Sequence, residues 1–215
     1  MFDLNTIIIL LCFATMSGFF AGLLGAGGGM IIVPALFFAF KITGYSDDTL
    51  MHLAVGTSLA VIFPTSIISS YTHYKLGNLD KNFFIYCSTF IFFGIIFGVI
   101  FTTNVNTKNL LILFSLYAFF SSIFILLTKE KGNKKKEIPN ILKSIFGLLT
   151  GFLSVPLGIG GASIMVPIMR FYNYSIREAI GTSAHFGVVI SLFGFISLMM
   201  SGHFFSNIQE PYSIG

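Results

Sequence analysis

The sequence predicts an all-α protein, a polytopic bundle of transmembrane helices built from an internal duplication. Charged residues make up only 9% of the 215 residues, whereas soluble domains carry about 25%. The mean hydropathy is +0.90, and long apolar runs alternate with short polar connections. Two of the apolar runs carry the same glycine motif. This composition excludes a soluble globular domain.

Charge-free runs can be counted as membrane spans, because a bilayer core about 30 Å thick requires about 20 apolar residues per helix. Six segments qualify, two of them interrupted by glycines: 4–40, 52–71, 82–102, 110–128, 145–169 and 179–201. The N-terminus has Asp3 as its only early charge and lacks the basic start of a signal peptide. The first segment is therefore expected to remain in the mature chain.

The stretch 129–143 carries six of the 12 basic residues. Because cytoplasmic loops hold the excess of Lys and Arg, this lysine-rich loop is predicted to face the cytoplasm. It divides the chain into a first transmembrane repeat, 1–128, and a second, 144–215. A lysine run can also bind anionic lipid or nucleic acid, but its place beside spans favours a solvated loop, and no nucleic acid is expected as a partner. The side of the N-terminus stays open, because segment 4–40 can cross once or dip in and return.

The chain repeats itself at two motifs. The stretch GFFAGLLGAGGGMIIVP from Gly18 aligns without gaps with GFLSVPLGIGGASIMVP from Gly151. The motif AVGTS at 54–58 follows the first stretch, and AIGTS at 179–183 follows the second. Two matched motifs in the same order predict an internal duplication, with the lysine-rich loop as the joint.

Both glycine motifs are predicted to break their helices inside the membrane, since each glycine in a helix costs about 1 kcal/mol relative to alanine. Irregular backbone at that depth is tolerated only against protein or a wet cavity. A helix that restarts after the turn directs its first N–H groups and the positive end of its dipole into the turn, which suits an anion. Interrupted segments in both halves are typical of secondary transporters, whose site lies at the repeat interface.

The predicted substrate-binding residues are the glycines of the two turns and the hydroxyls near them: Gly25, Gly27, Gly28, Gly29, Thr57, Ser58, Gly158, Gly160, Gly161, Ser163, Thr182 and Ser183. The Thr-Ser pairs can equally bond within their own helices. Gly18 and Gly22 have the spacing of a close helix contact. No catalytic residue, metal or cofactor is expected, because the sequence offers no paired carboxylates at membrane depth, no GxSxG and no metal-ligand cluster.

His185 is a possible proton relay, because an ionisable group in an apolar segment is a functional candidate. The alternative is a histidine bonded to neighbouring backbone. His73 and His203 lie at span ends and are expected at the membrane interface. Cys12 and Cys87 lie in apolar runs without a metal or redox spacing and are expected to be inert.

The paired glycine motifs followed by GTS, the GNLD turn at 77–80 and the PYSIG tail resemble the TauE/SafE sulfite exporters, also called the TSUP family. The resemblance implies a multi-pass protein of the inner (plasma) membrane, with two repeated halves. It also implies transport of small organic or sulfur-containing anions along a path that the glycine motifs and GTS pairs line. The second half departs by Ala162 where the first has Gly29, and it lacks counterparts of segments 82–102 and 110–128. The second repeat is therefore expected to be truncated.

The favoured function is a secondary transporter of a small anion, such as sulfite, a sulfonate or another organosulfur or organic anion, whose halves rock to expose the site alternately. The expected partners are this substrate and the lipid bilayer. A non-transporting membrane scaffold, an inactive truncated remnant and an anion channel stay open as alternatives, and an enzyme is not expected. The sequence leaves open the substrate, the direction of transport, the coupling ion and the oligomeric state.

Overall fold

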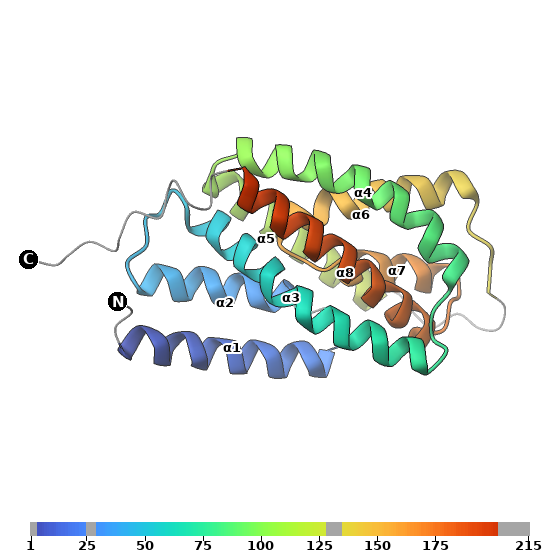
Figure 1. Ribbon diagram of the computed structural model, residues 1–215, viewed down its shortest axis with the longest axis horizontal. Helices are drawn as coiled ribbons and strands as arrows, with labels where there is room; N and C mark the ends of the chain where they lie inside the picture. The colour runs from blue at the N-terminus through green and yellow to red at the C-terminus, as the bar shows by residue number, and fades with distance from the viewer. Residues whose placement is uncertain (1–3, 25–28, 128–134, 202–215) are drawn as a thin grey trace, which may run out of the picture.

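The computed structural model describes residues 4–24, 29–127 and 135–201. Every regular element in these ranges is an α-helix, and the helices follow one another along the chain (Figure 1). Their bounds are α1 Leu4–Leu24, α2 Gly29–Ile42, α3 Leu50–Lys75, α4 Lys81–Asn104, α5 Thr107–Leu127, α6 Asn140–Leu157, α7 Ala162–Phe171 and α8 Ile176–Met200. The predicted all-α class is confirmed.

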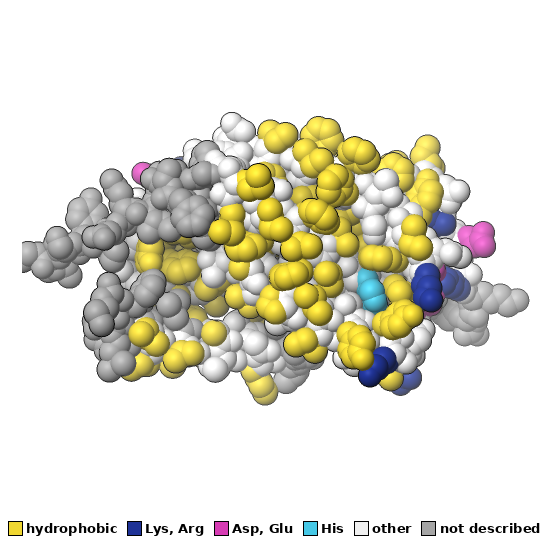
Figure 2. Space-filling view, viewed as in Figure 1, with side chains coloured by type: hydrophobic (Ala, Val, Ile, Leu, Met, Phe, Trp, Pro, Cys, Tyr) yellow, Lys and Arg dark blue, Asp and Glu magenta, His cyan; other side chains and the backbone are white. Residues whose placement is uncertain are grey.

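Five of the described helices, α3, α4, α5, α6 and α8, are long and apolar enough to cross a membrane. The helix α3 extends past the predicted span 52–71 at both ends, because backbone hydrogen bonds continue into the polar flanks. Figure 2 shows hydrophobic side chains over the middle of the molecule, whereas Lys and Arg side chains gather near one end. A multi-pass transmembrane bundle is therefore confirmed.

The two glycine-interrupted segments each form a pair of helices. The helix α1 ends at Leu24 and α2 begins at Gly29, while α6 ends at Leu157 and α7 begins at Ala162. In Figure 1, α1 enters from the end where the N-terminus lies and α2 runs back to that end. The pair α6 and α7 does the same from the opposite end. Segment 4–40 thus dips in and returns instead of crossing once.

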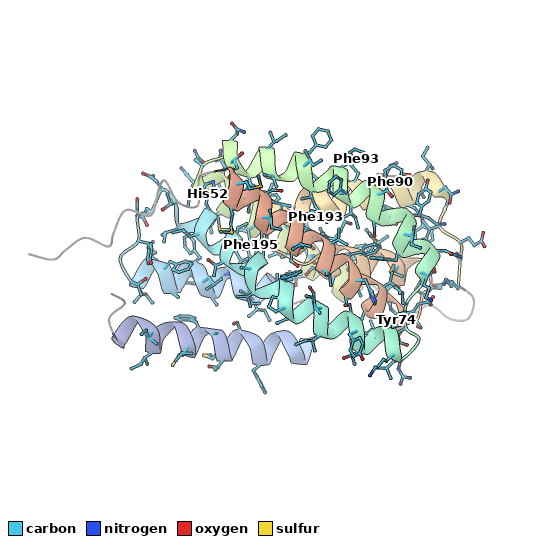
Figure 3. All side chains as sticks on the ribbon, viewed as in Figure 1. His52, Tyr74, Phe90, Phe93, Phe193 and Phe195 are labelled. Atoms are coloured by element: carbon cyan, nitrogen blue, oxygen red, sulfur yellow. The ribbon has the colours of Figure 1, made fainter. Side chains whose placement is uncertain are left out.

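The long helices α3 and α8 lie in contact and run in opposite directions between the two ends (Figure 1). Figure 3 shows His52 and Tyr74 near opposite ends of α3. At the His52 end, the imidazole Nε2 lies 2.9 Å from the carbonyl oxygen of Val105. This bond ties the start of α3 to the residue that follows α4. The other end of α3 lies near the lysine-rich loop.

The helices α4 and α6 pack closely along a line of glycines. A Cβ on Gly98 would lie 2.7 Å from the carbonyl oxygen of Phe152, and one on Gly147 would lie 2.9 Å from that of Cys87. Small residues allow two backbones to approach in a membrane. The Cys87 thiol is buried in this interface, as expected for an inert cysteine.

The order of elements in α1, α2 and α3 recurs in α6, α7 and α8, with the direction through the bundle reversed. Each short second helix has a proline inside it, Pro34 in α2 and Pro167 in α7. This correspondence agrees with the predicted duplication, which stays a prediction.

Candidate functional site

The turn between α6 and α7 breaks the helix where the second glycine motif predicts it. Gly158 and Gly161 have φ of +63° and +74°, in the left-handed region that side chains rarely adopt. The N–H groups of Gly158 and Ile159 bond back to the last turn of α6, and the Gly161 carbonyl accepts the N–H of Met165 at 2.8 Å. The glycines at 158 and 161 are therefore required by the backbone.

Protein from several helices surrounds this turn. A Cβ on Gly158 would lie 2.7 Å from Val33 Cγ2 in α2, and one on Gly161 would lie 2.6 Å from Ile190 Cδ1 in α8. A Cβ on Gly160 would meet Ile62 Cγ2 of α3 at 3.0 Å. The irregular backbone thus lies against protein, as the cost of unpaired polar groups in lipid demands.

The first interrupted segment meets the second at Gly29. A Cβ at Gly29 would lie 2.6 Å from the Gly158 carbonyl oxygen and 2.7 Å from Ile159 Cα. The start of α2 therefore packs directly on the turn between α6 and α7. The predicted site residues Gly25, Gly27 and Gly28 lie outside the described residues.

The two Thr-Ser pairs occupy different surroundings. Ser58 is buried and donates a 2.8 Å hydrogen bond to the carbonyl oxygen of Gly158. Thr182 accepts the N–H of Asp80 at 3.0 Å. Thr57 is half-buried, and Ser163 is buried in the first turn of α7. These contacts give Ser58 and Thr182 structural partners.

A cavity of about 530 Å³ lies beside the second glycine turn. Its wall comes from α1, α2, α3 and α8, with Gly160 and Ala162 contributed by the turn and the start of α7. The polar side chains in the wall belong to Ser17, Thr65, Ser66, Ser69, His73 and Ser183. Of the predicted site residues, the cavity brings together Gly160 and Ser183.

Ser183 is the predicted hydroxyl-bearing residue that lies in the cavity wall. Its hydroxyl is fully buried and has no hydrogen-bond partner among the described residues. A buried hydroxyl without a partner costs about 1–3 kcal/mol, so such a group calls for a structural or functional explanation. Thr150 and Ser154, on adjacent turns of α6, also have buried hydroxyls without partners.

The cavity extends along one face of α3. Ile62, Ser66, Ser69 and His73 are spaced three or four residues apart, which places them on a single helix face. From 62 to 73 the helix rises by about 16 Å. The cavity therefore runs from the second glycine turn toward the end of α3 near the lysine-rich loop. Sequence reasoning missed this polar face, although hydroxyls at helical spacing within an apolar span could have indicated it.

The family model described as "Sulfite exporter TauE/SafE" matches residues 9–209. The chain belongs to this family. It is 31% identical to a "Probable membrane transporter protein" of Haemophilus influenzae, over 96% of this chain and 79% of that relative. A protein of the same description from Methanocaldococcus jannaschii is 31% identical over 89% of this chain and 73% of the relative. No solved structure matches. The family resemblance of the sequence motifs is confirmed.

In this TauE/SafE protein, His185 does not line the cavity. Its Nδ1 lies 2.8 Å from the Gly181 carbonyl oxygen, so the ring donates to its own helix. The ring also packs edge-on against Phe84. These contacts are those of a histidine bonded to neighbouring backbone, and a relay role stays a prediction.

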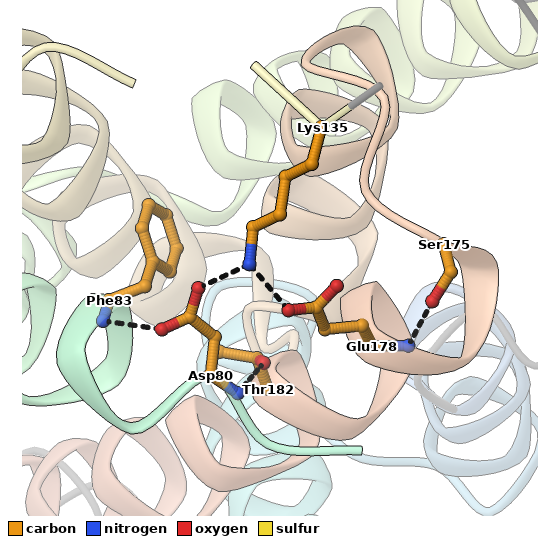
Figure 4. Close-up of polar contacts among 6 residues, drawn as sticks. All are labelled: Asp80, Phe83, Lys135, Ser175, Glu178 and Thr182. Carbon is orange, nitrogen blue, oxygen red and sulfur yellow. Dashed lines mark hydrogen bonds and ion pairs between the residues drawn. The ribbon is translucent and has the colours of Figure 1, made fainter. Parts of the chain in front are cut away.

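A cluster of ion pairs lies at the end of the TauE/SafE bundle near the lysine-rich loop (Figure 4). Lys135 Nζ lies 2.8 Å from Asp80 Oδ2 and 2.6 Å from Glu178 Oε1, and 4.1 Å from the ring centre of Tyr174. Asp80 also caps α4 by accepting the Phe83 N–H at 3.0 Å. The cluster joins the GNLD turn, the loop before α6 and the first turn of α8.

The electrostatics of this cluster follow from burial and pairing. Burial raises the pKa of the Asp80 carboxyl, but hydrogen bonds from Lys135 and Phe83 and the lysine charge outweigh it and lower the pKa overall. Burial alone would lower the pKa of Lys135. The hydrogen bonds to its two carboxylate partners outweigh this effect, so the pKa is raised overall. Burial raises the pKa of Tyr174 to about 12. All three groups therefore keep their ordinary charge states at neutral pH.

Within residues 4–24, 29–127 and 135–201, no group of three or more His, Cys, Asp or Glu side chains is placed so that it could hold a metal ion.

Proposed function

We propose that this chain is a secondary transporter of a small anion, and that the anion binds in the cavity beside the second glycine turn. The observation that carries the proposal is the unpartnered Ser183 hydroxyl in the same wall as Gly160 and Ala162. The start of α7 supplies the positive end of a helix dipole, and Ser183 supplies a hydrogen-bond donor. The relatives named as probable membrane transporters support transport as the activity.

The charge of the wall supports an anion over a cation. The described lining residues include no Asp or Glu, whose carboxylates would repel an anion. Sulfite, sulfonates and other organosulfur or organic anions are the substrates proposed. The proposal keeps the other predicted substrate-binding residues, which are Gly25, Gly27, Gly28, Gly29, Thr57, Ser58, Gly158, Gly161, Ser163 and Thr182.

The contact of Gly29 with Gly158 supports transport by alternating access. Two helix pairs enter from opposite ends and meet at this contact, which is the arrangement expected of inverted repeats in secondary transporters. We propose that 1–128 and 144–215 derive from a duplication and rock against each other.

The proposed orientation places the lysine-rich loop in the cytoplasm of a cell whose inner (plasma) membrane holds the chain. The N-terminal end of α1 then lies on the other side, because α1 and α2 return to the end opposite the loop. The cavity consequently extends toward the cytoplasmic side.

Uptake of radiolabelled sulfite and methanesulfonate into proteoliposomes tests the function. Ser183→Ala removes the proposed donor and is expected to lower uptake about tenfold or more, since a hydrogen bond to a charged group contributes about 1.5–3 kcal/mol. Ser191→Ala is the matched control, because Ser191 lies in the same helix and donates within it to Gly187 at 2.6 Å. Unchanged uptake by a folded Ser183→Ala protein would contradict the site.

The same assay separates the alternatives. A scaffold or an inactive remnant gives no uptake of either anion above empty liposomes. A channel gives a rate that rises linearly with anion concentration, whereas a transporter saturates. Saturable uptake of one anion is the result that the proposal requires.

A further inference from the structure

The cavity wall has a second feature that the proposed function leaves unexplained, the imidazole of His73. His73 lies in the last turn of α3, near the lysine-rich end, and its side chain lines the cavity that Ser183 also lines. The sequence predicts that His73 lies at the membrane interface. In the structure its side chain lines the cavity. The inference below rests on the proposed anion transport and deepens it.

Most hydroxyls in the cavity wall cannot donate to an anion as they stand. Ser17 donates to the Ala14 carbonyl at 3.0 Å, Thr65 to the Ile62 carbonyl at 2.9 Å and Ser66 to the Phe63 carbonyl at 3.0 Å. A hydroxyl has one proton, so each of these groups presents only lone pairs to the cavity. An anion needs donors, and these three positions supply none.

The side-chain donors left in the described wall are the hydroxyls of Ser69 and Ser183 and the ring of His73. Asn78 Nδ2 lies 3.4 Å from His73 Nδ1. Because an amide nitrogen donates, Nδ1 accepts this bond and the ring proton of the neutral form resides on Nε2. His73 therefore retains one N–H beyond its contact with Asn78.

His73 is also the only described lining residue whose side chain can become positively charged. The titratable groups around it come from several elements. His185 of α8 is close enough that its charge would repel that of His73. Lys75 and Lys81 lie over the rings of Tyr71 and Tyr74, and Asp80 is paired with Lys135. A bound anion is the partner that would favour the charged ring.

We propose that His73 binds the transported anion at the lysine-rich end of the cavity, and that protonation of its ring increases the affinity for that anion. Ser183 and the start of α7 then hold the anion near the centre, and His73 holds it nearer the proposed cytoplasmic mouth. A charged donor makes a shorter and stronger hydrogen bond than a neutral one. Protonation adds a hydrogen to Nδ1, so the Asn78 amide must then turn its oxygen toward that nitrogen. Binding of the anion and of one proton are thereby linked.

Methanesulfonate is a suitable probe, because a sulfonate keeps a single negative charge over the range in which histidine titrates. Binding is measured as thermal stabilisation of the purified chain in detergent, at about pH 5.5 and about pH 8. The wild-type chain is expected to bind about tenfold more tightly at the lower pH. His73→Gln retains an N–H donor without a charge and is expected to bind equally at both values. His52→Gln is the matched control, because His52 lies at the opposite end of α3 and outside the cavity wall, and it should keep the wild-type pH dependence.

The unliganded melting temperature reports whether each variant folds, and His73→Asn provides a second uncharged donor should His73→Gln fail to fold. If His73→Gln or His73→Asn binds methanesulfonate with the affinity and the pH dependence of the wild-type chain, the role proposed for His73 is overturned. The proposed function would still stand. Loss of the pH dependence in His52→Gln alone would also overturn the role of His73. Absence of both methanesulfonate binding and anion uptake in the wild-type chain would overturn the two proposals together.

Discussion

The Ser58 hydroxyl in α3 donates a 2.8 Å hydrogen bond to the carbonyl oxygen of Gly158, in the turn between α6 and α7. The bond joins one of the predicted Thr-Ser pairs to the opposite glycine motif, across 100 positions of sequence. It satisfies a backbone carbonyl that a helix break leaves without its usual partner. The Ser58 hydroxyl therefore stabilises the turn, and its contact with a substrate stays a prediction.

Ser58→Ala should lower the free energy of unfolding by about 1–3 kcal/mol, because the buried Gly158 carbonyl loses a donor. Ser70→Ala is the control, since Ser70 lies in the same helix and donates only to the Ile67 carbonyl within it, at 3.0 Å. A thiol-reactive dye can report unfolding through the buried Cys87, in a Cys12→Ser background that removes the exposed thiol. Equal melting temperatures for Ser58→Ala and Ser70→Ala would show that the bond contributes nothing.

Gly29→Ala should destabilise the chain by about 1–3 kcal/mol, because the added methyl group overpacks the centre of the bundle. Its Cβ would lie 2.6 Å from one backbone atom and 2.7 Å from another, and neither can rotate away. Gly18→Ala adds the same methyl group to α1 where no atom lies within 4 Å, so it should be neutral or slightly stabilising. The melting temperatures of the two variants are compared in the same detergent, and a Gly29→Ala protein as stable as Gly18→Ala would refute the close contact.

Much of the fold could be predicted from hydropathy and glycine content. The span predicted at 82–102 corresponds to α4, Lys81–Asn104, because apolar length and the capping Asp80 fix a helix locally. The break before α7 could also be predicted, since glycines at 158 and 161 adopt φ values that other residues avoid. These features depend on residues close together in sequence.

The path of segment 4–40 and the partners of the hydroxyls could not be predicted in this way. An apolar segment with a central break can cross or return, and the opposite directions of α1 and α2 in the folded chain distinguish the two. The spacing of Ser66, Ser69 and His73 indicates a shared helix face, but it does not say whether that face meets lipid or a cavity. Ser183 and Thr182 are adjacent in sequence, yet one is unpartnered and the other accepts from Asp80.

The ion-pair cluster of Lys135 should stabilise the fold over a defined pH window. The folded pKa of Asp80 is below its ordinary 3.8, so its contribution is present above about pH 4 and is lost as pH falls through the folded pKa. The folded pKa of Lys135 is above its ordinary 10.5, so its contribution is present below that value and is lost as pH rises through the folded pKa. The cluster therefore contributes fully at neutral pH.

Lys135→Met should reduce the unfolding free energy at pH 7 by about 0.5–1 kcal/mol, a modest value because the three side chains are partly solvated. The difference from wild type should shrink as pH falls toward the lowered pKa of Asp80, because its carboxylate then takes up a proton. Lys136→Met is the control in the adjacent exposed position. A wild-type advantage over Lys135→Met that stays constant from pH 7 to pH 3 would contradict the assigned linkage.

Cysteines introduced at the two ends of the bundle should be labelled by a thiol reagent from opposite sides of the membrane. Ser46→Cys places a thiol in the exposed connection between α2 and α3, at the N-terminal end, and Lys136→Cys places one in the exposed loop before α6. In a Cys12→Ser background the remaining Cys87 is buried and unreactive. A membrane-impermeant maleimide added to whole cells should label Ser46→Cys and spare Lys136→Cys, because the lysine-rich loop stays in the cytoplasm. In inside-out vesicles the pattern should reverse, and labelling of both thiols from one side in intact membranes would refute the return of α2 to the end opposite the loop.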